Sequence, residues 1–302
     1  MRVAAVSTRM PRLGILLLVI IALGWGTNWP AMKIALEDMP PWTFRLMCVA
    51  FGGMLLLALT ALRGDRIAVP LGRVPALALV SLLNVTGWQM FSAFGLLQIG
   101  SGRAAIIAFT MPLWASALGV FVLGERPGAQ QMLALGFGLC ALALLLGQDI
   151  AAVGSSPVGG LLMLGSALSW ATGTVLVKRF DWTGMPVTAL VGWQLLLGGI
   201  PVLIGTLMFE GVADFTAFGP ASYLATAYAV GVGMVLCTAA FFKLVTLVPA
   251  GVAATGTLAV PVVGVISSAL VLGEHIGLIE TTALALVVSG LFLLVWGSEA
   301  RA

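Results

Sequence analysis

The chain has 302 residues, of which 61% are hydrophobic and 8% are charged, and its mean hydropathy is +1.14. Soluble proteins carry about 25% charged residues, so this chain cannot cover itself with a polar surface and is predicted to lie in a lipid bilayer. The net charge is +3, but fourteen Lys and Arg are too few and too scattered for a nucleic-acid surface. No nucleic-acid partner is therefore expected.

A helix needs about 20 mostly apolar residues to cross the hydrocarbon of a bilayer. Ten segments meet this requirement, which predicts an all-α polytopic membrane protein with ten transmembrane helices. Seven of the ten contain no charged residue, and the others hold Lys33, Arg45 and Glu280 near an end. In chain order the predicted spans are Leu13–Ala35, Trp42–Leu62, Val74–Leu97, Ala104–Leu123, Gln130–Gly147, Val158–Val177, Val187–Met208, Ala221–Phe242, Gly251–Leu272 and Gly277–Trp296.

The distribution of basic residues predicts how these spans are oriented. If the N-terminus is cytoplasmic, eleven of the fourteen Lys and Arg fall in cytoplasmic loops or tails, and only Arg103 falls in an outside loop. This bias follows the positive-inside rule for a bundle with both termini in the cytoplasm. The first apolar run is longer than the core of a signal peptide, so we interpret it as an uncleaved span.

The chain contains an internal repeat. Seven residues between positions 102 and 125, in the fourth span and the loops beside it, recur unchanged 149 residues later. They are Gly102, Ala104, Ala105, Pro112, Leu123, Gly124 and Glu125, which match Gly251, Ala253, Ala254, Pro261, Leu272, Gly273 and Glu274. In the first span, Trp25 recurs with an offset of 145 at Trp170. The predicted halves, 1–150 and 151–302, hold five spans each, so the second half enters the membrane upside down. Inverted repeats are typical of secondary transporters.

Three features resemble the drug/metabolite transporter superfamily, specifically two tandem EamA-type units. They are the LGWGTN motif at 23–28, Arg45 early in the second span, and the paired Gly-x9-Pro-x11-Gly-Glu blocks. Within this superfamily the chain is most similar to YddG-type bacterial exporters of aromatic amino acids. The resemblance implies a multi-pass protein of the bacterial inner (plasma) membrane. It also implies ten helices in a basket around a central cavity, lined mainly by the first, third, fourth, sixth, eighth and ninth.

Polar and aromatic side chains share faces of several spans. Trp25 and Asn28 are spaced to share one face of the first span. Asn84 and Trp88 likewise share one face of the third span. An amide inside a span is costly unless it faces a cavity or a partner helix, so helix packing is the alternative for both faces. The predicted substrate-binding residues are Trp25, Asn28, Asn84, Trp88, Phe91, Phe109, Thr110, Met111, Trp170, Thr174, Tyr228 and Thr257.

Two symmetry-related prolines, Pro112 and Pro261, lie inside the fourth and ninth spans. Proline removes a backbone hydrogen bond and bends a helix. Static kinks that shape the bundle are one interpretation, and kinks that let helix ends swing during gating are the other.

Several charged residues lie near predicted helix ends. Glu125 and Glu274 each follow a glycine, and we expect the glycine to end one helix and the glutamate to open the next, without a catalytic role. Lys33 and Arg45 are expected near the outer face, where they snorkel and pair with nearby acids. The alternative for these two cations is a role in attracting a carboxylate at the outer gate.

The motifs that are missing narrow the mechanism. The sequence has no G-x-x-x-x-G-K-[ST] loop and no acid at mid-span, which disfavours ATP drive and exchange of organic cations for protons. One His and three Cys do not support a metal site, and no cofactor is expected. We predict a secondary transporter, not an enzyme, that exports aromatic or hydrophobic amino acids and related metabolites by alternating access. The alternatives are export of other small metabolites or drugs, or a polytopic membrane enzyme.

Overall fold

The computed structural model describes residues 12–124, 129–151, 157–247 and 259–299, and the regular elements in these ranges are all helical. Before residue 152 they are α1 (Arg12–Ala35), α2 (Pro41–Leu62), η1 (Leu71–Arg73), α3 (Val74–Ser81), η2 (Leu82–Gly87), α4 (Trp88–Gln98), α5 (Ser101–Ala108), α6 (Met111–Val122) and α7 (Ala129–Ala151). After it come α8 (Val158–Arg179), α9 (Val187–Gly205), η3 (Thr206–Glu210), η4 (Phe215–Ala217), α10 (Pro220–Tyr228), η5 (Ala229–Leu236), α11 (Cys237–Leu247), α13 (Ala259–Leu272) and α14 (Leu278–Glu299).

Seven helical segments are long and apolar enough to cross a membrane, and three further apolar helices are shorter within the described residues. The long segments match the predicted spans closely, as at Pro41–Leu62 and Val187–Glu210. The prediction of an all-helical polytopic membrane protein is confirmed. That all ten segments cross the bilayer stays a prediction.

The fourth predicted span is divided into α5 and α6 by a tight turn. Proline at position 112 has no N–H to donate to the carbonyl of Ala108, so the regular ladder cannot continue through this point. Instead, the N–H of Thr110 bonds to the carbonyl of Ile107 at 3.1 Å, and the N–H of Leu113 bonds to that of Thr110 at 2.9 Å. Pro112 therefore lies in the first turn of α6, where a missing N–H has no cost.

The third and eighth spans are each interrupted by a π-helical segment, which the sequence analysis did not predict. The segment η2 joins α3 to α4, and η5 joins α10 to α11. Because η5 begins 147 residues after η2, the two interruptions fall at equivalent places in the two repeats. A π-helical turn is wider than an α-helical turn and frees backbone carbonyls for other donors.

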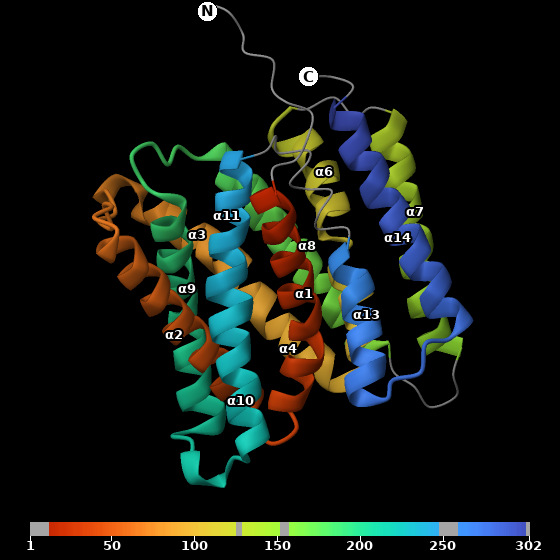
Figure 1. The fold of residues 1–302 in the computed structure, drawn as a ribbon, viewed down its shortest axis with the longest axis horizontal. Helices are drawn as coiled ribbons and strands as arrows, with labels where there is room; N and C mark the ends of the chain where they lie inside the picture. Colours follow the sequence, from red (N-terminus) through yellow and green to blue (C-terminus); the bar gives the residue numbers. More distant parts are fainter. Residues whose placement is uncertain (1–11, 125–128, 152–156, 248–258, 300–302) are drawn as a thin grey trace, which may run out of the picture.

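The two halves of the chain are interlocked. Helix α1 packs mainly against α10, α11 and α13 of the second half, while α8 packs mainly against α4 and α6 of the first. At opposite edges of the bundle, α2 lies along its repeat counterpart α9, and α7 lies along its counterpart α14 (Figure 1). The interface between the halves therefore runs through the middle of the molecule.

Candidate substrate-binding site

Helix α1 crosses the π-helical segment η5 at two of the predicted site residues. The indole N–H of Trp25 donates to the carbonyl of Gly233, with an N···O distance of 2.9 Å. Asn28, one turn further along α1, lies so close that a Cβ atom on Gly233 would be 3.0 Å from its Oδ1. This Oδ1 is buried and has no hydrogen-bond partner. The crossing thus uses a backbone carbonyl of η5 as an acceptor, and it leaves the amide oxygen of Asn28 unused.

The second crossing joins η2 to α8 and contains the predicted residue Asn84. Its Nδ2 donates to Oε1 of Gln194 at 3.0 Å, but its Oδ1 is buried without a partner. A Cβ atom on Gly173 of α8 would lie 2.1 Å from that Oδ1, so only glycine fits the present arrangement. One turn away, Ser169 donates to the carbonyl of Leu83 at 2.8 Å.

The two crossings are equivalent in the internal repeat. Asn28 and Gly173 are 145 residues apart, which is the offset of the first-span repeat, and Asn84 and Gly233 are 149 apart, the offset of the later block. In each crossing an asparagine of one half faces a glycine of the other half, with the roles of the two helices exchanged. Each also leaves one buried amide oxygen unpartnered. The structure therefore brings Asn28 and Asn84 into matched positions at the interface between the halves.

The aromatic rings near the first crossing come from both halves. Trp25 lies 5.9 Å from Phe241 between ring centres, and the Tyr228 hydroxyl lies 2.5 Å from that of Thr27. Trp170, the repeat counterpart of Trp25, is half-buried on α8 and is not among the ring partners of Trp25. The predicted residue Thr174 is half-buried one turn later on α8.

The remaining predicted residues lie on packing surfaces or at the turn before α6. Phe91 packs beside α8, where a Cβ atom on Gly165 would be 3.5 Å from its ring, and Trp88 packs against the main core. Phe109 and Thr110 are buried at the turn, and the indole of Trp114 donates to the Thr110 hydroxyl at 3.1 Å. Met111 is half-buried at the start of α6, and Pro261 is buried near the start of α13. Thr257 lies outside the described residues.

The prediction for Glu274 is partly wrong. Gly273 does end α13, with a φ of +66°, but Glu274 does not open α14, which begins at Leu278. Its carboxylate instead accepts from the N–H groups of Ser101 and Gly102, at 2.6 and 2.9 Å, and so caps α5 of the other half. Glu125, its repeat counterpart, lies outside the described residues.

Two more carboxylates cap helices across the halves, and the sequence predicts neither cap. Glu210 accepts from the N–H groups of Trp42 and Thr43 at the start of α2, at 3.0 and 2.7 Å. Asp38 accepts from the Gly219 N–H at 2.7 Å and from the Ser222 hydroxyl at the start of α10. These hydrogen bonds lower the pKa of Asp38 below its ordinary value. Caps between residues about 170 apart in the chain leave no local sequence signal.

The expected pairing with nearby acids is wrong for Arg45. The charges of Glu37 and Glu274 attract Lys33, without an ion pair to either within the described residues. Lys33 donates to the carbonyls of Leu96 and Ile99 at the end of α4, the latter at 3.1 Å. A cation is favourable there because a helix C-terminus is negative. Arg45 does not snorkel to the surface, since it is 2% exposed and makes no ion pair within the described residues.

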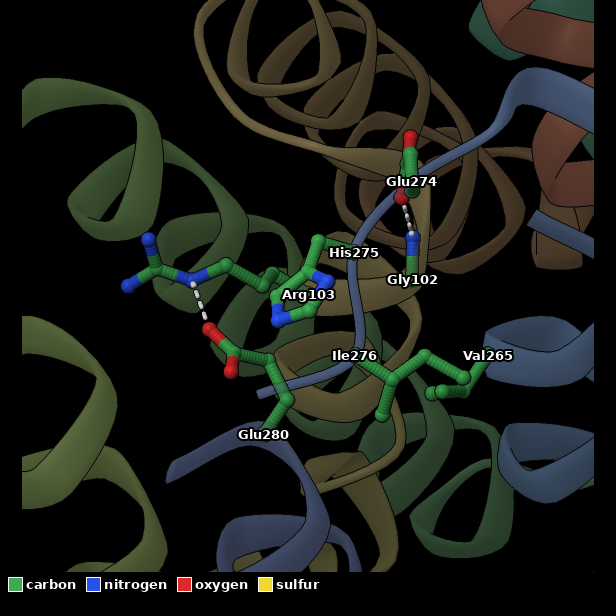
Figure 2. Close-up of a pocket in the computed structure, with 7 residues that line it drawn as sticks. All are labelled: Gly102, Arg103, Val265, Glu274, His275, Ile276 and Glu280. Carbon is green, nitrogen blue, oxygen red and sulfur yellow. Dashed lines mark hydrogen bonds and ion pairs between the residues drawn. The ribbon is translucent and has the colours of Figure 1, made fainter. Parts of the chain in front are cut away.

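A small cavity of about 20 Å³ lies beside the Glu274 cap (Figure 2). Its charged lining includes Arg103 and Glu280, whose nearest nitrogen and oxygen are 3.8 Å apart. His275 also lines it. A space of this size holds a water molecule at most, so this cavity is too small to be the substrate-binding site.

A multi-pass apolar bundle whose halves interlock around matched polar crossings has the construction of a membrane transporter. The EamA-like transporter family matches the chain twice, over residues 12–147 and over residues 157–296. The chain therefore belongs to the EamA-like transporter family and carries two tandem units of it.

Similar proteins cover nearly the whole chain. It is 29% identical over 293 residues to an uncharacterized transporter, YvbV, of Bacillus subtilis, which covers 95% of this chain and 92% of that one. It is 28% identical over 305 residues to a probable amino-acid metabolite efflux pump of Escherichia coli, over 95% and 96% of the two chains. One solved crystal structure superimposes with a TM-score of 0.67 over 95% of this chain and 98% of its own. At 19% identity, that likeness supports the fold alone.

Proposed function

We propose that this protein is a secondary transporter that exports aromatic and other hydrophobic amino acids, and related metabolites, by alternating access. In this proposal ten helices cross the bacterial inner membrane as two inverted five-helix repeats, 1–150 and 151–302. The observation that carries it is the matched pair of crossings, Asn28 against Gly233 and Asn84 against Gly173. Inverted-repeat transporters bind their solutes at such an interface, because rocking one half against the other opens it to each side in turn.

The chemistry of the crossings favours a solute with an apolar body and few charges. Trp25 lies one turn before Asn28, whose oxygen is unpartnered, and the Tyr228 hydroxyl contacts that of Thr27 on the same helix. Both rings offer aromatic surfaces at this crossing. An indole face stacks well on another ring, and an amide oxygen accepts a hydrogen bond from an ammonium group. An aromatic amino acid combines both groups. The similarity to a probable amino-acid metabolite efflux pump supports the same class of substrate.

The positions of charged residues support an orientation with both termini in the cytoplasm. The start of α1 and the end of α14 point toward the same end of the bundle (Figure 1). The pair of Arg73 and Asp181, 2.8 Å apart, joins the loops before α3 and after α8, where basic residues are concentrated. Asp38, Glu210 and Glu274 lie at the other end of the bundle, which is the outside in this orientation.

Export can be tested in cells with a toxic aromatic analogue. Cells that express the protein should tolerate more 4-fluorophenylalanine than cells with an empty vector, because an exporter lowers the internal concentration. Expression of a Trp25→Ala variant at the same level should reduce this tolerance, since the aromatic surface is lost. Equal sensitivity of the wild-type and empty-vector cells, with the protein present in the membrane, would refute export of aromatic amino acids.

A further inference from the structure

Arg45 is a buried cation with no counter-charge among the residues that the structure describes. It lies in the first turns of α2 and is 2% exposed, and no carboxylate within the described residues forms an ion pair with it. Buried charges in proteins are normally paired, because a charge removed from water is costly, and this cost is high inside a membrane protein. A guanidinium in such a place needs a partner that the described side chains do not provide.

The contacts of Arg45 leave its guanidinium only partly satisfied. Its Nη2 donates to the Ser92 hydroxyl at 2.8 Å, and its Nη1 donates to the sulfur of Met32 at 3.3 Å. Its Nε is buried without a partner, and its Cζ lies 5.0 Å from the centre of the Phe44 ring. A thioether sulfur is a weak acceptor, whereas the planar fork of a guanidinium fits two carboxylate oxygens. A carboxylate would therefore replace the Met32 contact at little cost.

The helix that carries Ser92 also contains an acceptor that lacks a donor. Gln89 lies one helical turn before Ser92 on α4, is 3% exposed, and has a buried Oε1 with no hydrogen-bond partner. Met32 lies one turn after Asn28 on α1, so the two side chains share the helix face of the first crossing. Unused donors on Arg45, an unused acceptor on Gln89 and the nearby aromatic crossing match the carboxylate, ammonium and side chain of an amino acid.

We propose that Arg45, together with Ser92, binds the carboxylate of the transported solute, and that Gln89 accepts one hydrogen bond from its ammonium group, whose other N–H groups include the donor to Asn28. This assignment rests on the proposed function, and it adds the residues that select a zwitterion over an apolar amine. Arg45 lies near the end of α2 that carries the Glu210 cap. A solute held there is one step from release at that end of the bundle.

The test compares recognition of a carboxylate with recognition of the matched amide. In liposomes that contain only this protein, labelled phenylalanine is exchanged against unlabelled phenylalanine or phenylalaninamide. Phenylalanine should compete well and the amide poorly. In Arg45→Gln the KM for phenylalanine should rise about 10- to 100-fold, because a hydrogen bond to a charged group is lost. In the same variant the amide should compete about as well as phenylalanine. Arg73→Gln, which removes an arginine at the other end of the bundle, should retain the wild-type preference.

A second variant covers the case in which Arg45→Gln does not fold, and a binding measurement tests recognition of the carboxylate directly. If Arg45→Gln does not fold, Arg45→Lys keeps the charge but loses the planar fork, so it should show a KM about 10-fold higher. Benzoate, but not benzamide, should raise the melting temperature of the wild type and not that of the Arg45 variant that folds. Wild-type protein without phenylalanine exchange would refute the proposed substrate class alone. A folded Arg45 variant with the wild-type KM and preference, or equal effects of benzoate and benzamide on the wild type, would refute the carboxylate site.

Discussion

Substitution of Gly173 by alanine tests the crossing between α8 and η2. The added Cβ would lie 2.1 Å from Oδ1 and 3.0 Å from the backbone nitrogen of Asn84, so the two helices must move apart. Overpacking of this kind costs about 1–3 kcal/mol. Loss of the hydrogen bond from Asn84 to Gln194 would add about 1 kcal/mol. Alanine recovers about 1 kcal/mol through its higher helix propensity. The net expected loss of stability is about 1–3 kcal/mol.

Thermal unfolding in detergent and phenylalanine exchange in liposomes measure this effect. Gly173→Ala should melt at a lower temperature and exchange more slowly than the wild type. Adding Asn84→Ala should recover part of the lost stability, because it removes the overlapping amide and leaves only the backbone contact. Gly231→Ala is the matched control. Gly231 lies in the π-helical segment η5, and a Cβ atom at this position would meet nothing within 4 Å. A Gly173→Ala variant as stable and as active as Gly231→Ala would refute the close crossing.

Three further predictions address the substrate surface, the caps and the orientation. Trp170→Ala, expressed at the wild-type level, should reduce phenylalanine exchange because it removes an aromatic surface, and normal exchange would exclude Trp170 from the site. Hydrogen bonds lower the pKa of Asp38 below its ordinary value in the folded protein, so the stabilisation that they provide is complete at neutral pH and is lost in acid. Asp38→Asn should therefore lower the melting temperature more at pH 7 than near pH 3, and an equal effect at both would refute the cap. A single cysteine at position 213 should be labelled from the periplasmic side and one at position 65 should not, whereas the reverse result would refute the orientation.

The positions of the helices could be predicted from the sequence, because they depend on local apolar length. The requirement for about 20 apolar residues predicts a second span at Trp42–Leu62, and the observed α2 is Pro41–Leu62. The division between α5 and α6 falls where Pro112 predicts a kink. In contrast, the π-helical segment η2 could not be predicted, because its residues, Leu82–Gly87, include no proline to mark it. The wider turns of η2 occur where it packs closely against α8, which is a tertiary contact.

The candidate site could be predicted only in part, for a similar reason. The spacing of Trp25 and Asn28 identified the inward face of α1, and the repeat offset related Asn28 to Gly173. The partner across each crossing depends on tertiary packing, which the spacing does not contain. Arg45 was expected to pair near the surface because acids are close in sequence. Its guanidinium instead donates to Ser92, 47 residues away on α4.

Counterflow of radiolabelled phenylalanine in liposomes that contain only this protein tests the central claim most directly. The liposomes are loaded with unlabelled phenylalanine and diluted into labelled phenylalanine, with no proton gradient imposed. We predict transient accumulation of label above the external concentration, because no carboxylate lies at mid-span in the described helices to require coupling to protons. Protein-free liposomes should show no accumulation. Folded, reconstituted protein that gives no more accumulation than protein-free liposomes would contradict the account.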